Sequence, residues 1–216
     1  MPDTITQNKT ELIKQEILLE LKDKLEKREG SVDLIAWLQS TDFFTSPSST
    51  IFHGNDDGGL AEHSLHVYKL LQEKNQRYNL GIKPDTMAIC GLLHDVCKTN
   101  SYKLEKKNRK VDGVWREEFV WVVDDKLPLG HGEKSVMMIQ RFIHLTDDEL
   151  MAIRWHMGAF EPGTAFNYPT GYAFKGATKK APIVTALMTA DMEAANILEG
   201  DGYNPNHKLS EERMSN

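Results

Sequence analysis

The segment 182–198 has the periodicity of an amphipathic helix, but a carboxylate lies in the middle of its apolar face. Val184, Leu187, Ala195 and Leu198 lie one or two turns from Asp191, so burying this face would also bury Asp191. An ionised carboxylate in a protein interior costs several kcal/mol unless it is paired or binds a metal ion. Because no Lys or Arg lies on this stripe, the sequence favours a metal ion as the counter-charge.

Three further polar residues interrupt apolar helix faces in the same way. His63 shares a face with Leu60, Val67 and Leu70, and the pair His94-Asp95 ends another apolar segment. Imidazoles and carboxylates are common ligands of transition metals, so the combination of these residues with Asp191 indicates a metal site. A single histidine on an apolar face is usually a hydrogen-bonded core residue, and that or surface exposure is what we expect for three others: His66, His144 and His207.

Helical periodicity recurs along the chain and predicts a mostly α fold. A capping box of Thr146 and Glu149 predicts a helix that ends near Gly158. The other helices are expected at 8–28, 32–39, 58–74, 85–97, 131–144 and 182–198, with Asp56 or Asp57 capping the third and a long loop between about 158 and 180.

One strand signal interrupts this pattern. Residues 101–123 alternate in polarity around Asp112-Gly113, which predicts a β-hairpin closed by a two-residue turn. The turn residues of 41–50 suggest a boundary, so we divide the chain into an N-terminal helical extension (1–45), a main domain (46–200) and a C-terminal tail (201–216).

Composition excludes several classes of protein. The formal net charge of -6 argues against a surface built wholly for nucleic acid, and no apolar run approaches the roughly 18 residues of a membrane span. The first residues lack the apolar segment of a secretory signal, so we expect a cytoplasmic protein without membrane contacts. Cys90 and Cys97 are two cysteines seven residues apart, which we expect to be reduced thiols.

The interrupted helix faces resemble motifs of the HD-domain superfamily of metal-dependent phosphohydrolases. GGLAEHSLHV (58–67), LLHDVCK (92–98) and LMTADMEAA (187–195) are similar to its His, His-Asp and Asp motifs, and the resemblance covers about residues 50–198. GHGEKS (130–135) and RWHMG (154–158) resemble the extra histidine motifs of the two-metal subset. The GGLAEHS form is particularly similar to HD domains of bacterial 3′ to 5′ exoribonucleases. The implied fold is an HD-domain helical bundle with the hairpin as an insertion.

The resemblance also implies roles for individual residues. His63, His94, Asp95 and Asp191 would hold one divalent ion, and Asp95 would bridge to a second ion held by His131 and His156. The implied cofactors are two transition-metal ions, from Fe, Mn, Ni or Zn. Besides Asp95, the implied catalytic residue is Lys98, which completes an HDxxK pattern and would neutralise charge on a phosphoryl group.

Several features admit a second interpretation. Lys98 is either a catalytic residue or a solvated lysine, and His53 either contacts substrate or fixes its loop by a hydrogen bond. The basic segment 103–110 either attracts a polyanion or is a solvated face. The aromatic residues of 158–180 either form a lid that stacks a base or pack the loop onto the domain. Cys97 adjoins the His-Asp pair, but without a Cys-His-Asn arrangement we do not expect it to be a nucleophile.

The expected function is hydrolysis of a phosphomonoester or phosphodiester by a metal-activated water. The substrate would be a phosphorylated small molecule, such as a nucleotide, or a nucleic-acid end. A di-iron oxygenase of the same superfamily is the first alternative, since the ligand set alone does not separate the two. A non-catalytic nucleotide-binding or interaction module is the second. No protein partner is identifiable from the sequence.

Overall fold

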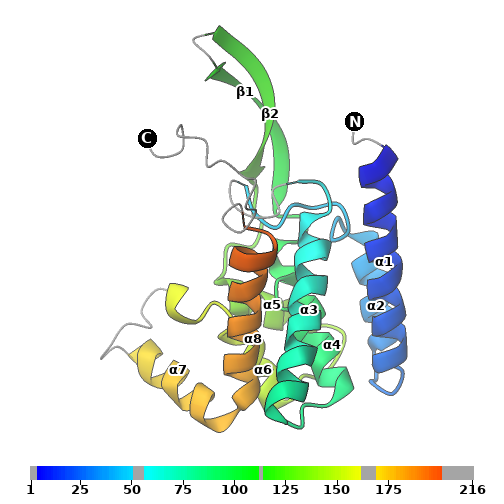
Figure 1. Cartoon of the computed structure of the whole chain (residues 1–216), viewed down its shortest axis with the longest axis vertical. Helices are drawn as coiled ribbons and strands as arrows, with labels where there is room; N and C mark the ends of the chain where they lie inside the picture. The colour runs from blue at the N-terminus through cyan, green and yellow to red at the C-terminus, as the bar shows by residue number, and fades with distance from the viewer. Residues whose placement is uncertain (1–3, 51–55, 112–113, 162–168, 201–216) are drawn as a thin grey trace.

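The protein is a helical bundle from which a single β-hairpin projects, as seen in a computed structural model (Figure 1). The structure describes residues 4–50, 56–111, 114–161 and 169–200. The N-terminal helices α1 (Thr4–Lys24) and α2 (Ser31–Ser40) pair along one side, and the hairpin of β1 (Tyr102–Val111) and β2 (Val114–Val123) extends from one end. The predicted mostly α fold with one hairpin is confirmed.

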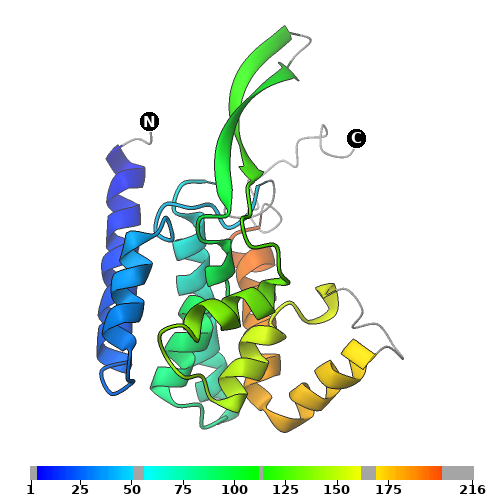
Figure 2. The ribbon, with the colours of Figure 1, turned by 180° about the vertical axis from the view of Figure 1, so that it is seen from behind.

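The centre of the bundle is formed by helices that hold the interrupted apolar faces. Helix α3 (Gly59–Tyr78) packs against both α4 (Pro84–Leu93) and α8 (Pro182–Glu193). Seen from behind, α5 (His131–Ile139) and α6 (Asp147–Arg154) cover this layer (Figure 2). Helix α7 (Pro169–Lys180) packs on α8. Helix α5 packs on α6 and on the 3₁₀ turn at Val96–Lys98 that follows α4.

Two glycines allow the helices to approach closely enough to assemble a site. A Cβ on Gly91 would lie 2.7 Å from the Cα of Tyr68, so α3 and α4 are nearly in backbone contact. A Cβ on Gly132 would collide with the backbone of Arg154, which joins the start of α5 to the end of α6. Glycine is required where backbones come this close. These close contacts hold α4 against α3 and the start of α5 against the end of α6.

The N-terminal extension shares the core of the main domain. Ile17, Leu21, Leu25 and Leu34 are fully buried in the same hydrophobic cluster as residues of α3, α4 and α8. The division of the chain at residue 45 stays a prediction, and residues 201–216 lie outside the described residues. Within the described ranges, no helix is both long and apolar enough to cross a membrane.

Several helix boundaries differ from the predicted ones. The helix expected at 85–97 ends at Leu93, because Asp95 leaves helical geometry (φ -105°, ψ 16°) before a 3₁₀ turn at Val96–Lys98. The first helix spans 4–24 rather than 8–28, and α3 begins behind Gly58, without a side-chain cap from Asp56 or Asp57. The helix expected at 131–144 ends at Ile139, and α8 changes into a π-helix at Ala194–Leu198. The capping box of Thr146 and Glu149 is confirmed.

The long loop expected between 158 and 180 is wrong in its second half, where α7 lies. Gly171 and Gly176 lower the helix propensity of this segment, which hid it from periodicity. Pro169 at its first position and Lys179 and Lys180 in its last turn were the available signals. Phe174 lies 5.7 Å from Trp155 between ring centres, whereas Phe160 and Tyr172 are exposed. Phe166 and Tyr168 lie outside the described residues.

Candidate metal centre

Five side chains from four parts of the fold converge at the centre of the bundle. His63 comes from α3, His94 and Asp95 from the turn after α4, His156 from the turn after α6, and Asp191 from α8. His63, His94, Asp95 and His156 each retain at most 2% of their exposure. Asp191 is expected to be buried, but 16% of its side chain is exposed, so it lies nearer the surface than the other four. These five predicted ligands are therefore brought together.

The first group of ligand atoms surrounds His63. Its Nε2 lies 3.1 Å from Oδ1 of Asp191 and 3.9 Å from Oδ2 of Asp95. The donor atoms of His63, His94 and Asp191 all lie within 4.8 Å of one another, a spacing that suits one metal ion. Asp95 Oδ2 is 3.7 Å from His94 Nε2, so this carboxylate borders the same space.

The hydrogen bonds of His94 and His156 direct one nitrogen of each ring toward this space. Nδ1 of His94 donates to the carbonyl of Gly91 (3.0 Å), and Nδ1 of His156 donates to that of Ile153 (2.7 Å). A carbonyl only accepts, so the proton is fixed on Nδ1 and the neutral ring presents the lone pair of Nε2. Among the described residues, neither buried Nε2 has a hydrogen bond of normal geometry. Metal ligation would satisfy both atoms, so the residues fit a metal ion.

The protonation tendencies of the histidines differ with their neighbours. Burial lowers the pKa of His94 to about 4, which keeps this imidazole neutral and ready to bind a metal ion. Burial also lowers the pKa of His63, but hydrogen bonds to Asp191 and Glu199 outweigh it and raise the value to about 9. In the metal-free protein His63 therefore tends to carry a proton on both ring nitrogens, and a metal ion would have to displace one of them.

Glu199 is a residue of the site that sequence reasoning missed. Its carboxylate accepts from Nδ1 of His63 (3.0 Å) and from Nδ1 of His66 (2.8 Å). Burial alone would raise the pKa of Glu199, but these two bonds lower it to about 2. Carboxylates that orient a metal-binding histidine in this way are common around metal sites. The only sequence signal was an acidic residue shortly after Asp191, past the end of the predicted helix.

The sixth predicted ligand, His131, lies at the exposed edge of the cluster. Its Nδ1 is 3.5 Å from Sγ of Cys97, and that sulfur is 3.9 Å from Oδ1 of Asp95. Donor atoms of Asp95, Cys97 and His131 lie within 4.8 Å of one another. His156 was expected beside His131, but no group of three within this limit joins these two histidines in the described part of the chain. His156 Nε2 instead lies 3.3 Å from Asp95 Oδ1.

Cys97 consequently lies at the edge of the candidate metal centre, a position that the sequence did not predict for it. Burial raises the pKa of its thiol to about 12, which agrees with the expectation that it is not a nucleophile. A thiol between an imidazole and a carboxylate is also a potential metal ligand. Its position two residues after Asp95, across a 3₁₀ turn, was the signal that could have identified it.

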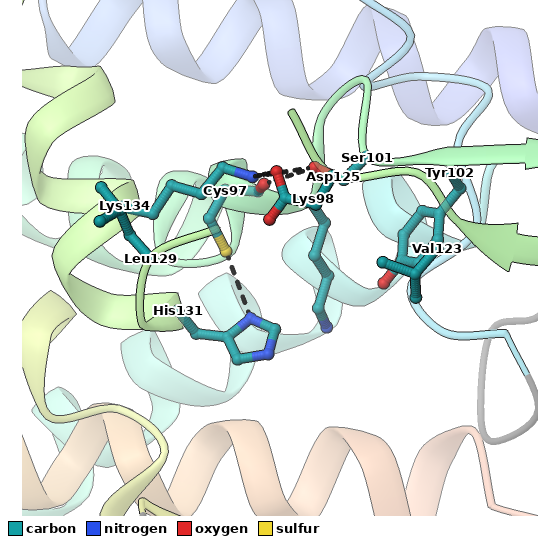
Figure 3. A pocket seen from close by; sticks show the side chains of 9 residues that line it. All are labelled: Cys97, Lys98, Ser101, Tyr102, Val123, Asp125, Leu129, His131 and Lys134. Atoms are coloured by element: carbon teal, nitrogen blue, oxygen red, sulfur yellow. Dashed lines mark hydrogen bonds and ion pairs between the residues drawn. The ribbon is translucent and has the colours of Figure 1, made fainter. Parts of the chain in front are cut away.

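An open pocket begins at this edge. It has a volume of about 220 Å³ and contains Lys98, whose side chain extends between His131 and Tyr102 (Figure 3). The amine of Lys98 lies 2.6 Å from Oδ2 of Asp95. Burial lowers the pKa of Lys98, but the carboxylate of Asp95 outweighs it, so the amine stays charged. The other lining residues are Cys97, Ser101, Val123, Asp125, Leu129 and Lys134.

Two sequence expectations remain outside this geometry. His53 lies outside the described residues. The basic segment 103–110 has acidic neighbours on strand β2 as well as Glu105 within it. Lys106 forms an ion pair with Glu117 across the hairpin, and Lys103 lies 3.1 Å from Glu105.

The arrangement defines a class: helical domains that bind divalent metal ions through histidine and aspartate at the centre of a bundle. A model of the HD domain family matches residues 60–194, which is more than half of the chain. The protein therefore belongs to the HD domain family, whose members are in general metal-dependent phosphohydrolases. Searches of curated proteins and of solved structures return no match. The finer likeness to HD domains of exoribonucleases stays a prediction.

Proposed function

We propose that this protein hydrolyses a phosphomonoester or phosphodiester, at a nucleotide or a nucleic-acid end, with two divalent ions from Fe, Mn, Ni or Zn. The proposal is supported above all by the two buried Nε2 atoms of His94 and His156 beside Asp95, whose partner Lys98 lines an open pocket. A structural metal site needs no such opening, whereas a catalytic one does. We also propose that the protein acts in the cytoplasm.

In this proposal the protein residues hold the ions and the phosphate. His63, His94, Asp95 and Asp191 would hold one ion, while Asp95 with His131 and His156 would hold the other. Such ions supply Lewis-acid chemistry, lowering the pKa of water and polarising a phosphoryl oxygen. Asp95 would be the shared ligand, since its two oxygens face different histidines, Oδ1 toward His156 and Oδ2 toward His94.

Lys98 would then act on the substrate. Its amine is paired with Asp95 in the metal-free protein, and cations bound by Asp95 would weaken that pair. The released ammonium group would lie in the pocket, where it would neutralise charge that develops on the phosphoryl oxygens. His53 remains a proposed substrate contact.

The test is to determine the metal content of the purified protein and to assay aryl phosphate monoesters and diesters with each of the four metals. We expect turnover that Asp95→Ala lowers at least about 10³-fold, because the variant loses the shared ligand. Asp148→Ala, an exposed change on α6, is the control. Absence of bound metal, or unchanged activity in Asp95→Ala, would contradict the proposal. Oxygen consumption by an iron-loaded protein would favour the oxygenase instead, and nucleotide affinity without turnover would favour a binding module.

A further inference from the structure

One face of the hairpin combines aromatic rings with lysines. Alternate residues of a strand point to the same side of a sheet, and the register pairs Lys106 with Phe119 and Lys110 with Trp115. The same parity adds Trp121, opposite Leu104, and Tyr102, opposite Val123. We call this surface the aromatic face, and its six defining residues are Tyr102, Lys106, Lys110, Trp115, Phe119 and Trp121.

Two rings of the aromatic face are largely open to solvent, and the other two, Tyr102 and Trp121, are half-buried. Trp115 is 69% exposed and Phe119 70%, and the hairpin projects away from the bundle (Figure 1). Within the paired residues 102–111 and 114–123, no aromatic residue has the opposite parity, where the apolar residues are valines. Large exposed rings gathered on one side usually mark a binding surface.

The charge of the hairpin favours an anionic partner. Residues 102–123 include six Lys and Arg against four Asp and Glu, in a chain whose net charge is -6. On the aromatic face itself, Lys106 and Lys110 stand against Glu117, which is ion-paired with Lys106. A second copy of the chain would place these lysines against each other, so charge complementarity disfavours self-association.

The aromatic face is continuous with the pocket of the metal centre. Tyr102 and Val123, the paired residues at the base of the hairpin, line the pocket together with Lys98 (Figure 3). A ligand that lies along the hairpin would therefore reach the amine of Lys98 without leaving the surface. This continuity connects the exposed rings to the place where a phosphate would be cleaved.

We propose that the aromatic face binds a single-stranded polynucleotide and directs its end into the pocket at Lys98. Unpaired bases would stack on Trp115, Phe119 and Trp121, while the lysines between them neutralise backbone phosphates, as on other single-strand-binding surfaces. A duplex offers no free base faces for such stacking and is the disfavoured ligand. The inference deepens the proposed function, on which it relies only for the position of the reacting phosphate.

The experiment measures binding separately from turnover. Fluorescence anisotropy of a labelled twelve-nucleotide oligo(U), oligo(dT) and a duplex of the same length would be followed with the full-length, metal-loaded protein. We expect the double variant Trp115→Ala/Phe119→Ala to bind the single strands at least about fivefold more weakly, because each stacked base contributes appreciably to affinity. Trp115→Phe/Phe119→Tyr should restore most of the affinity. Tyr78→Ala, an exposed aromatic at the end of α3, should leave it unchanged.

A matched pair of lysine variants distinguishes the aromatic face from general attraction. Lys110→Ala lies on the aromatic face and Lys107→Ala on the opposite one, with the same change in charge. We expect a larger loss of affinity for Lys110→Ala. Equal losses for the two variants, unchanged binding by the double aromatic variant, or no binding of single strands by the wild type would overturn the proposal.

Hydrolysis of a small aryl phosphodiester separates this inference from the proposed function. The double aromatic variant should keep that activity while its KM for an oligonucleotide rises. If the wild type binds oligonucleotides but hydrolyses no ester with any metal, the proposed function fails and the binding surface stands. If ultracentrifugation shows a dimer that the double variant dissociates, with oligonucleotide binding unaltered, the aromatic face is an interface between copies and the inference fails.

Discussion

Arg28 is a partly buried charged residue and Asp95 a fully buried one, and they differ in whether the polar groups around them all have partners. The guanidinium of Arg28 forms a two-point ion pair with Glu149 (2.9 and 3.0 Å) and also reaches Asp85 and the carbonyl of His144. Glu149 in turn accepts from Thr86 and from the backbone of Thr146. Every oxygen of Glu149 therefore has a partner within the protein.

The surroundings of Asp95 are unfinished by comparison. Its oxygens are paired with Lys98 and lie 3.3 to 3.9 Å from nitrogens of three imidazoles. Of these, the buried Nε2 atoms of His94 and His156 lack hydrogen bonds of normal geometry within the described residues. The comparison teaches that burial of charge does not by itself indicate function. A buried charge whose partners are complete stabilises the fold, whereas a buried cluster that still has open donor atoms has room for a ligand.

The largest change in stability should come from breaking the cluster of Arg28 and Glu149, in which all partners are present. Glu149→Ala leaves Arg28 partly buried with fewer partners, and removal of one member of a buried pair costs roughly 3 kcal/mol or more. Chemical denaturation should show this loss of unfolding free energy. The exposed neighbour Asp148→Ala should change it by less than about 1 kcal/mol. Similar stability in the two variants would mean that the Arg28 cluster is not a structural device.

The cluster around Asp95, in which two imidazole nitrogens lack hydrogen bonds of normal geometry, should instead be stabilised by a metal ion. Addition of a tightly bound divalent ion at about 100 times its dissociation constant should stabilise the wild type by about 2.7 kcal/mol. His94→Ala should abolish this gain, because it removes a ligand, while Glu149→Gln should retain it despite lower stability. Thermal unfolding with and without a chelator measures both. A gain that persists in His94→Ala would place the ion elsewhere.

A smaller effect is expected from Glu199, which positions His63. Glu199→Gln weakens the acceptor that fixes Nδ1 of His63, and such changes typically lower metal affinity about 10- to 100-fold. Competition with a metal indicator would measure the affinity. Glu193→Gln, at the end of α8 and paired with Lys74, is the matched control. Equal affinities in the two variants would remove Glu199 from the site.

The smallest expected effect is on how the unfolding free energy depends on pH in the acid range. Burial alone would raise the pKa of Glu149, but hydrogen bonds from Arg28, Thr146 and Thr86 hold it below its usual range. A carboxylate with a lowered pKa contributes stability above its unfolded pKa of about 4.3, and that contribution is lost as the pH falls through the folded value. Between pH 6 and 3 the wild type should therefore lose more unfolding free energy than Glu149→Gln. A steeper loss in the variant would contradict this assignment.

Much of the site was predictable because its residues break a strong local pattern. His63, His94, Asp95 and Asp191 interrupt apolar stripes, and such interruptions are visible without a structure. His156 and His131 lie in turns or at a helix start, where no stripe exists to interrupt, and only the resemblance to a family identified them. Glu199 was missed because its role depends on contacts with His63 and His66, which are distant in the sequence. Cys97 was missed although it lies only two residues after Asp95.

The helices were predicted better than their ends. Periodicity over 59–78 or 182–193 is long enough to identify a helix. It does not show that the chain leaves helical geometry at Asp95. Helix α7 was missed because its glycines weaken the periodic signal. The hairpin was predicted from its alternation, yet the significance of its aromatic face depends on the register and on the pocket at its base.

Because of the π-helix at Ala194–Leu198, the position of Glu199 at the metal centre depends on the number of residues in this segment. These wider turns set the direction in which Glu199 leaves α8, toward His63 and His66. Each residue of an α-helix advances the side-chain direction by about 100°, so deleting one residue from 194–198 would turn Glu199 away from both rings. The fit of this site is thus sensitive to a deletion that changes no ligand and removes no charge.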